Sequence, residues 1–495
     1  MLKLILLLIY IFLILTVIFL ERKSPTEALL WVLVLVCLPY LGAILYLIFG
    51  STIAIKLTAF IRKKRLQQYQ AEKDPPSSTD SPFHGESTGL SDAGWLSLSD
   101  EDCQVVRFNA SYNESPLTSY ENASIYTSGK SHYEQLFQDL RHAETCIFVE
   151  FYTIHHDAVG EAFAAALAER ARAGVEVLVL CDFIANLSTP QKMFLPLTQA
   201  GGKVIRVKPY FTHYRSHRKI VSIDHRISYI GGMNIGKQYA NMAAVKNPWR
   251  DTQIRLEGEA CARVLDEYFL TDWLCSVRQK DRSKAIARLF ALPKAEPLFI
   301  SASAFSPRCT EPSSRNLCQF IVGGVDSNKE AVKMCYLSMI RSARKRIRIQ
   351  SPYFIPDSSI LDALKTAAAA GVEIELMIPG IKASFFLDPV TTYYCGQLLE
   401  YGAKVYKYHG YIHAKTMIID EELCCIGSVN MDIRSLQVDD EICGVFYENA
   451  LVKQYTDCFD TDITNCTPYT WQTFLERSSR EHFQESIFLL FAPLM

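Results

Sequence analysis

The sequence predicts an α/β protein made of two fused, similar halves. Segments 148–180 and 349–378 each contain an apolar strand, an alanine-rich amphipathic helix and a second apolar strand. In both segments the tetrapeptide AGVE joins the helix to the second strand. Corresponding residues lie about 200 positions apart along the chain, which is the usual size of a domain. Strand–helix–strand order predicts a mainly parallel sheet in each half.

A short pattern of histidine, lysine and aspartate occurs once in each half. The two copies have identical spacing and consist of His217, Lys219 and Asp224, and of His413, Lys415 and Asp420. A strand places the histidine and the lysine of each copy on one face. Because two positive charges on one face repel each other, the pattern indicates that an anion such as phosphate binds between them. A single copy would most often be a solvated strand edge, but two copies predict one shared site between the halves.

A turn with the pattern G-x-x-N follows each copy. Its polar residues are Asn234 in the first half, and Ser428 and Asn430 in the second. We expect these side chains to donate hydrogen bonds to phosphate oxygens. Asp224 and Asp420 close their strands, where fixing a turn is at least as good an explanation as proton transfer.

Two downstream carboxylates are candidates for orienting the histidines. Asp251 in WRDT follows His217, and Glu441 in DDEI follows His413. A carboxylate that holds one ring nitrogen leaves the other correctly placed for chemistry. The rivals of Glu441 for this role are its neighbours Asp439 and Asp440. Four other histidines, at positions 155, 156, 213 and 409, have no partner at a spacing that indicates a shared role, and we expect them to lie outside the site.

This set of residues fits phosphodiester exchange. The reaction needs a nucleophile, an acid for the leaving alcohol and positive charge around the phosphoryl oxygens. His217 and His413 can fill the first two roles, since imidazole titrates near neutral pH. Lys219 and Lys415 would hold the non-bridging oxygens. The chain shows no carboxylate cluster that calls for a metal, and we expect no metal and no cofactor.

The N-terminal region predicts a transmembrane hairpin. Residues 2–20 and 28–50 are almost entirely apolar, and each is close to the length that a membrane-spanning helix needs. A cleaved signal peptide is the alternative for the first segment, but no typical cleavage site follows it. Basic residues flank the outer ends, including RKKR at 62–65, so both ends of the hairpin are expected in the cytoplasm.

Composition supports a tethered enzyme rather than a nucleic-acid-binding protein. The net charge is only −2, and the 15 cysteines form no CxxC pair typical of a zinc site. Residues 71–99 are rich in Pro, Ser, Asp and Gly, which is typical of a flexible linker. The predicted organisation is a hairpin with basic flank (1–66), a linker (67–100), a first α/β domain (101–295) and a second (296–495).

The doubled H-x-K-x4-D pattern resembles the phospholipase D superfamily, and the wider sequence is most similar to bacterial cardiolipin synthases. The similarity includes 247–258, 350–357 and 427–435, and it covers essentially the whole chain. The segment LQVDDEICG (436–444) differs from the sequence that usually follows the second motif in these enzymes.

The resemblance implies a membrane-bound phosphatidyltransferase that condenses two phosphatidylglycerols to cardiolipin and glycerol through a phosphatidyl-histidine. It implies His217 as nucleophile and His413 as general acid, although the motifs are symmetric and leave the opposite assignment open. It also implies a multi-pass protein of the bacterial cell membrane with its catalytic halves in the cytoplasm; the oligomeric state stays open. A hydrolytic phospholipase D is the alternative, since it would use the same residues. A nucleic-acid-directed relative or binding protein is a third reading, which the intact motifs, the hairpin and the near-neutral charge disfavour.

Overall fold

The computed structural model describes ten stretches of the 495-residue chain: 2–21, 25–51, 53–73, 98–208, 215–241, 247–292, 316–324, 330–382, 384–447 and 450–492. Three features predicted from sequence lie outside them. These are the linker between residues 74 and 97, His213, and the domain boundary at 295/296.

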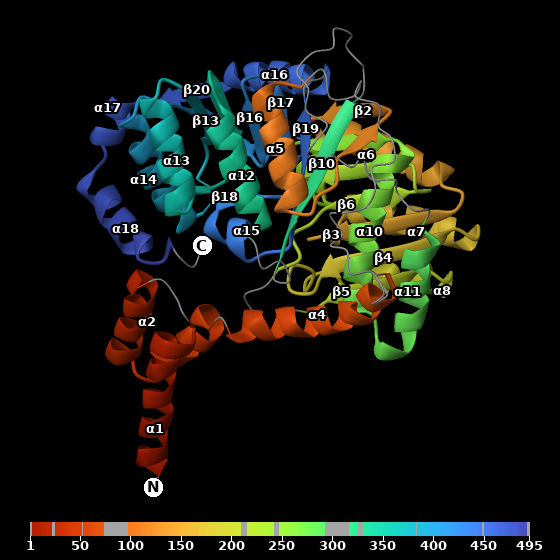
Figure 1. The fold of residues 1–495 in the computed structure, drawn as a ribbon, viewed down its shortest axis with the longest axis horizontal. Helices are drawn as coiled ribbons and strands as arrows, with labels where there is room; N and C mark the ends of the chain where they lie inside the picture. Colours follow the sequence, from red (N-terminus) through yellow and green to blue (C-terminus); the bar gives the residue numbers. More distant parts are fainter. Residues whose placement is uncertain are drawn as a thin grey trace.

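The first half is a sheet with helices on its faces (Figure 1). Its elements in chain order are β2 (Asn122–Tyr126), α6 (Gly129–His142), β3 (Cys146–Phe151), α7 (Ala158–Arg172), β4 (Glu176–Asp182), η5 (Gln191–Phe194), α8 (Leu195–Gln199), β5 (Lys203–Val207), β6 (Ile220–Ile223), β7 (Ile227–Gly231), α9 (Lys237–Ala240), β8 (Trp249–Arg250), β9 (Gln253–Glu257), α10 (Glu259–Ser276), η6 (Gln279–Asp281) and α11 (Arg282–Ala291). The seven sheet strands are ordered β2-β9-β7-β6-β3-β4-β5. Strands β3, β4 and β5 are parallel to one another, and the other neighbours are antiparallel.

The second half repeats this plan. Its elements are β10 (Asn316–Gly323), α12 (Ala331–Ser342), β11 (Arg346–Gln350), β12 (Phe354–Ile355), α13 (Ser358–Ala369), β13 (Glu373–Pro379), α14 (Leu387–Leu399), β14 (Lys404–Tyr408), β15 (Tyr411–Ile412), β16 (Thr416–Ile419), β17 (Leu423–Gly427), β18 (Met431–Asp432), α15 (Ile433–Gln437), β19 (Glu441–Tyr447), α16 (Ala450–Ile463), β20 (Cys466–Tyr469), α17 (Trp471–Leu475) and α18 (Ser479–Leu489). The core strands are ordered β10-β19-β17-β16-β11-β13-β14, the same order as in the first half, with β20 added at one edge. The predicted α/β repeat is therefore confirmed. The expected mainly parallel sheet is wrong, because only two neighbouring strand pairs in the main sheet of each half are parallel, and the strands that follow the histidine motifs return antiparallel.

Equivalent local signals set the bounds of the matching helices α7 and α13. Asp157 and Asp357 cap their N-termini by accepting hydrogen bonds from backbone N–H groups of the first turn. Gly174 and Gly371 follow their C-termini, each at φ +95°, a conformation that favours glycine. The AGVE tetrapeptides thus end the helices and lead into buried strands.

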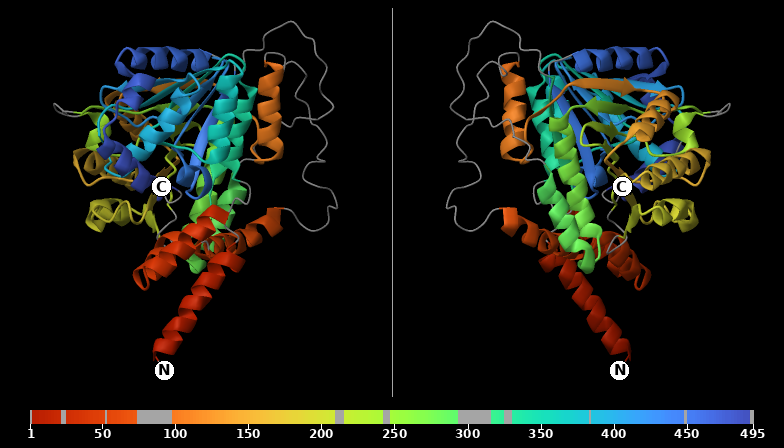
Figure 2. Two further views of the ribbon diagram at one scale, coloured as in Figure 1. Left: turned by 90° about the vertical axis from the view of Figure 1, so that its left-hand side faces the viewer. Right: turned by 90° about the vertical axis from the view of Figure 1, so that its right-hand side faces the viewer.

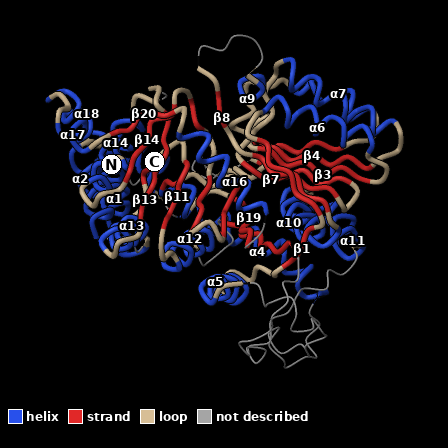
Figure 3. The backbone as a smooth tube through the Cα atoms, turned by 90° about the horizontal axis from the view of Figure 1, so that it is seen from above, coloured by secondary structure: helices blue, strands red, loops and turns tan. Residues whose placement is uncertain are grey.

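The two halves share one hydrophobic core and exchange chain segments. One buried cluster joins Ile220, Ile230 and Ile254 of the first half to Ile418 and Ile442 of the second. In addition β1 (Thr118–Tyr120) pairs with β10, and α5 (Asp100–Ser111) packs on α12. Viewed from above, the two sheets lie side by side with β8 at their junction (Figure 3).

The N-terminal region consists of helices that precede the two halves in the chain. They are α1 (Leu2–Leu15), η1 (Thr16–Leu20), α2 (Pro25–Cys37), α3 (Leu41–Leu45), η2 (Tyr46–Gly50) and α4 (Ile53–Lys73). Helix α1 projects from the molecule, whereas α4 runs beneath the first half and packs against α10 (Figures 1 and 2). In the described part of the chain, none of the helices is both long enough and apolar enough to cross a membrane. Large apolar side chains of this region, such as Phe12, Phe19 and Leu29, are exposed.

Candidate active site

The two histidine motifs meet at the junction because each motif segment pairs with the opposite half. The N–H of His217 donates to the carbonyl of Asp440 at 2.8 Å, next to a parallel bridge between Ser216 and Asp440. Correspondingly, the N–H of His413 donates to the carbonyl of Arg250 at 2.7 Å, where β15 pairs with β8 in parallel. The backbone therefore brings both motifs into a single site.

The predicted orienting carboxylates contact the histidines in a crossed arrangement. Nδ1 of His217 lies 2.8 Å from Oε1 of Glu441, and Nδ1 of His413 lies 2.6 Å from Oδ2 of Asp251. Each carboxylate thus pairs with the histidine of the other half and not with the one that it follows in the chain. A carboxylate acceptor at Nδ1 places the proton there and leaves Nε2 as the reactive nitrogen.

The two lysines form the positive centre of the site. Lys219 and Lys415 are only 0% and 1% exposed, and each donates to the backbone carbonyl of its motif histidine. Burial lowers the pKa of Lys219 to about 7 and that of Lys415 to about 8, against the opposing effect of the nearby carboxylates. Burying two cations together is costly unless an anion compensates them, so the arrangement suits a phosphodiester.

Both histidines are neutral near pH 7. Burial, reinforced by the two lysines, holds the pKa of His217 well below its usual value. Burial and then Lys415 lower the pKa of His413 to about 3. The two side chains remain 13% and 12% exposed, so solvent reaches the site. A neutral imidazole with a free Nε2 lone pair is the form that attacks phosphorus.

Ser428 supports the carboxylate on the first histidine. Its hydroxyl donates to Oε2 of Glu441 and accepts the N–H of Ile442 at 3.0 Å. Burial raises the pKa of Glu441 to about 7, while Lys219 acts in the opposite direction. At the position equivalent to Ser428 the first half has Gly232, where an added Cβ would overlap Oδ1 of Asp251. The carboxylate on His217 therefore accepts a serine hydroxyl, whereas the carboxylate on His413 has a glycine at the equivalent position.

The two motif asparagines are engaged with the protein. Asn234 accepts the N–H of Thr153 at 3.1 Å and donates to the hydroxyl of Tyr239 at 2.7 Å. Its Nδ2 has a second N–H, so its contact with phosphate stays a prediction. Asn430 is half-buried, and its side chain hydrogen-bonds Asp432.

Asp224 and Asp420 lie at the far ends of β6 and β16 from the histidines. Asp224 accepts the backbone N–H groups of residues 144, 145 and 146. Asp420 accepts those of residues 344, 345 and 346 in the same way. Both adopt positive φ angles, of 54° and 53°. Their carboxylates fix the start of β3 and β11, so the geometry favours the structural role over the catalytic one.

Aromatic side chains line the site and were not predicted. The ring of Tyr152 packs edge-on against His217 at 4.8 Å between centroids. Trp249, Tyr239 and Tyr411 surround His413 at 5.2, 5.7 and 5.9 Å. Tyr411 precedes His413 by two residues, and strand alternation could have placed it on the same face.

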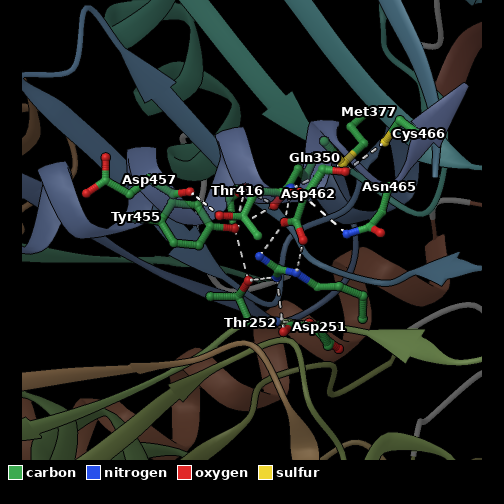
Figure 4. Close-up of polar contacts among 12 residues, drawn as sticks. Asp251, Thr252, Gln350, Met377, Thr416, Tyr455, Asp457, Asp462, Asn465 and Cys466 are labelled. Atoms are coloured by element: carbon green, nitrogen blue, oxygen red, sulfur yellow. Dashed lines mark hydrogen bonds and ion pairs between the residues drawn. The ribbon is translucent and has the colours of Figure 1, made fainter. Parts of the chain in front are cut away.

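A buried polar network holds the Asp251 segment against the second half (Figure 4). Arg250 donates to Asp462 of α16 at 3.1 Å and contacts Thr252. The hydroxyl of Tyr455 contacts Thr252 at 2.9 Å and donates to Gln350 at 2.6 Å. These contacts fix the carboxylate that faces His413.

Of the four histidines expected outside the site, the three that the structure describes make local contacts elsewhere. His155 contacts Gln238 at 2.6 Å, His156 lies 3.2 Å from Glu161, and His409 contacts Thr467 at 2.8 Å. Their expected exclusion from the chemistry fits these local contacts.

Comparisons with known proteins match both halves. The sequence matches the family described as "Cardiolipin synthase, PLD-like domain" over residues 136–273 and 336–463. It also matches "Phospholipase_D-nuclease N-terminal" over residues 8–51. The cardiolipin synthase of Oceanobacillus iheyensis is 31% identical over 97% of this chain and 96% of its own length. The major cardiolipin synthase of Bacillus subtilis is 30% identical over the same shares, and one from Clostridium perfringens is 32% identical over 96% and 95%.

A solved structure supports the fold. The phosphatidylserine synthase of Haemophilus influenzae superimposes with a TM-score of 0.61 over 79% of this chain and 97% of its own, at 14% identity. Two α/β halves that join paired histidine–lysine motifs in one site define a protein of the phospholipase D superfamily. Within it, the chain belongs to the cardiolipin synthase family, as the sequence resemblance predicted.

Proposed function

We propose that the protein is a phosphatidyltransferase that condenses two phosphatidylglycerols to cardiolipin and glycerol. The observation that carries the proposal is the crossed pairing of His217 with Glu441 and of His413 with Asp251 around two buried lysines. Relatives of nearly full-length similarity are named cardiolipin synthases, which gives the substrate class.

The first step forms a covalent intermediate. Nε2 of His217 attacks the phosphorus of one phosphatidylglycerol, and the bond from phosphorus to the headgroup glycerol oxygen breaks. The phosphodiester anion favours a charged imidazole beside it, so in the substrate complex His413 carries a second proton, on Nε2, and gives that proton to the leaving glycerol. Lys219 and Lys415 balance the charge on the non-bridging oxygens.

The second step reverses these roles. A hydroxyl of a second phosphatidylglycerol gives its proton to His413 and attacks the phosphorus of phosphatidyl-His217. The phosphorus–nitrogen bond breaks, cardiolipin leaves and the neutral His217 is restored. Since one phosphodiester replaces another, the overall reaction is close to energetically neutral.

The N-terminal region serves as the membrane anchor. Residues 2–20 and 28–50 would insert as a two-helix hairpin, with both ends on the cytoplasmic side of a bacterial cell membrane. The support is their apolar composition, the exposed apolar side chains and the match of residues 8–51 to an N-terminal family of its own. The two catalytic halves, 101–295 and 296–495, then face the cytoplasm. They follow helix α4, which includes residues 67–73 of the segment predicted as a linker (67–100).

Lipid product analysis across a series of glycerol concentrations tests the proposed reaction. Purified full-length protein is incubated with phosphatidylglycerol in detergent micelles. A transferase gives cardiolipin, and its yield falls as glycerol rises, because glycerol attacks the same intermediate. Phosphatidic acid as the main product at every glycerol level would instead identify a hydrolase.

A further inference from the structure

A large basic cavity lies between helix α4 and the edge of the first half. Its volume is about 1040 Å³, and its walls come from α4, α8, β5 and the end of α10. None of the motif histidines, lysines or carboxylates lines it. The size suits the headgroup and the first part of the acyl chains of a phospholipid.

The charge in this cavity is of one sign. Five cations line it together with Arg62, namely Arg65, Lys192, Arg206, Lys208 and Arg278, and no carboxylate is among its described lining residues. Arg206 donates to the backbone carbonyls of residues 186 and 189, and Arg65 to that of Cys275. The Nε atom of Arg65 is buried without a hydrogen-bond partner. Neutral acceptors leave the positive charge of these groups uncompensated.

The remaining wall is apolar. Phe183, Phe194, Leu195, Ile205 and Val207 face the same space as the cations. A purely polar anion would gain nothing from this surface, whereas an anion with attached hydrocarbon would gain from both parts. Helix α4 follows the apolar N-terminal segments directly, so the cavity lies on the side of the molecule from which they project (Figure 1).

We propose that this cavity is an accessory binding site for an anionic phospholipid, separate from the two lipids that react. Basic clusters next to membrane segments attract anionic lipid, at a gain that grows with each Lys or Arg. The membrane position rests on the proposed function, but the binding itself does not require turnover.

Photolabelling of the full-length His217→Ala protein in phosphatidylcholine nanodiscs tests the site without catalysis. A photoactivatable phosphatidylglycerol should label peptides within 183–208 and 275–278. Replacing two exposed cations together, Lys192→Gln and Arg278→Gln, should reduce this labelling roughly tenfold. The matched control Lys130→Gln with Arg141→Gln, on the exposed surface of α6, should not reduce it.

Three outcomes would overturn the assignment. They are equal labelling by a photoactivatable phosphatidylcholine, unchanged labelling in the Lys192/Arg278 variant, and full displacement by inorganic phosphate, which would identify a site for free phosphate. Equal thermal unfolding midpoints for both double variants establish that folding is not the cause. Because the readout is binding, it is independent of whether the enzyme transfers or hydrolyses.

A second and independent observation concerns Arg62 of α4. On one side of the junction, Arg250 precedes Asp251 and forms an ion pair with Asp462 of α16, at 2.6 Å. On the other side, Asp440 precedes Glu441 at the equivalent position, and Asp272 of α10 is the equivalent of Asp462. The exchange of arginine for aspartate therefore places two carboxylates where the first side has an ion pair.

Arg62 supplies the missing positive charge. Its guanidinium lies 2.6 Å from Asp272 and 2.8 Å from Asp440, and the residue is only 6% exposed. Arg218 also pairs with Asp272 and donates to the backbone carbonyl of Glu441 at 3.2 Å. Two arginines thus balance two aspartates beside the carboxylate that holds His217.

We infer that Arg62 is a positioning residue that couples helix α4 to the active site through Asp440. It holds the start of β19, so the Glu441 carboxylate stays on Nδ1 of His217. The unusual sequence Asp439-Asp440-Glu441 and the buried Arg62 of α4 therefore belong to one ion-pair network. Its loss would misplace Glu441, and small misplacements of catalytic groups are costly in rate.

Kinetics on detergent-dispersed phosphatidylglycerol test this role. Arg62→Gln should lower kcat at least tenfold with KM changed less than twofold. The control Lys63→Gln removes the same charge from an exposed neighbour and should behave as the parent.

A second-site variant separates positioning from simple anchoring. Arg62→Gln combined with Asp440→Arg recreates the Arg250–Asp462 arrangement on this side and should recover kcat to within about threefold of the parent. Failure of this rescue in a protein with a parental unfolding midpoint would contradict the inference. Equal kcat losses in Arg62→Gln and Lys63→Gln would contradict it as well.

Discussion

Glu441 of the second half holds Nδ1 of His217 in the first, at 2.8 Å between oxygen and nitrogen. The reciprocal pair, Asp251 with His413, has the same geometry at 2.6 Å. Each histidine therefore depends on a carboxylate from the other half for its tautomer and orientation. A half on its own would contain a histidine, a lysine and a carboxylate, but no completed pair.

The crossed pairing predicts which single substitutions behave alike. On a phosphatidyl substrate with a nitrophenol leaving group, protonation of the leaving group matters little. His413→Ala and Asp251→Asn should therefore keep much of the nitrophenol burst, whereas His217→Ala should abolish it and Glu441→Gln should reduce it about a hundredfold. Stopped-flow absorbance measures the burst. Pairing within each half would instead make Asp251→Asn resemble His217→Ala.

Ser428 and Gly232 test the crossed pairing through residues that contact the two carboxylates. Ser428→Ala removes a hydrogen bond to the buried carboxylate of Glu441, which costs about 1–3 kcal/mol, or roughly 5- to 150-fold in rate if the whole cost falls on the transition state. Gly232→Ala pushes on Asp251 instead. With the nitrophenol substrate, Ser428→Ala should slow the burst and Gly232→Ala should spare it; the opposite order would contradict the assignment of the two pairs.

The lysines predict the alkaline limb of the pH profile. Burial lowers the pKa values of Lys219 and Lys415 to about 7 and about 8. Since only the charged lysines bind the phosphodiester anion, kcat/KM should be highest below these values and fall as pH rises through 7 to 8. Arginine stays charged at these pH values, so in the Lys415→Arg variant the fall of kcat/KM at alkaline pH should come from Lys219 alone. A kcat/KM that stays level from pH 7 to 9 on a soluble short-chain substrate would contradict this origin.

Asp420 predicts a loss of stability rather than of chemistry. Its carboxylate accepts three backbone N–H groups at the start of β11. Asp420→Asn should lower the free energy of unfolding by about 1–3 kcal/mol, while kcat of the folded protein changes less than threefold. Denaturant unfolding and kinetics below the transition measure both. A hundredfold loss of kcat at normal stability would contradict this prediction and indicate a catalytic role for Asp420.

The sequence predicted the features that depend on local residue patterns or on the internal repeat. Strand and helix periodicity, the AGVE boundaries and the identical motif spacing gave the two α/β halves and their shared site. The crossing of Asp251 and Glu441 depends on pairing between segments that lie 162 and 224 residues apart, and spacing along one chain carries no such signal.

Other features depended on partners that only the fold brings near. Arg62 belongs to the run RKKR, and nothing in that run distinguishes it from its exposed neighbours. Its burial follows from Asp272 and Asp440, which approach α4 in space. The contacts of Asn234 with Thr153 and Tyr239 likewise form only in the folded chain and could not be predicted from its residue type.

Trapping the covalent intermediate tests the central claim most directly. The full-length protein is mixed with phosphatidylglycerol labelled at phosphorus, quenched with base within one turnover and digested for peptide mapping. The account predicts the label on the peptide that contains His217, more of it in His413→Ala with a nitrophenol donor, and none in His217→Ala. A label on His413, above all one that persists in His217→Ala, would contradict the account.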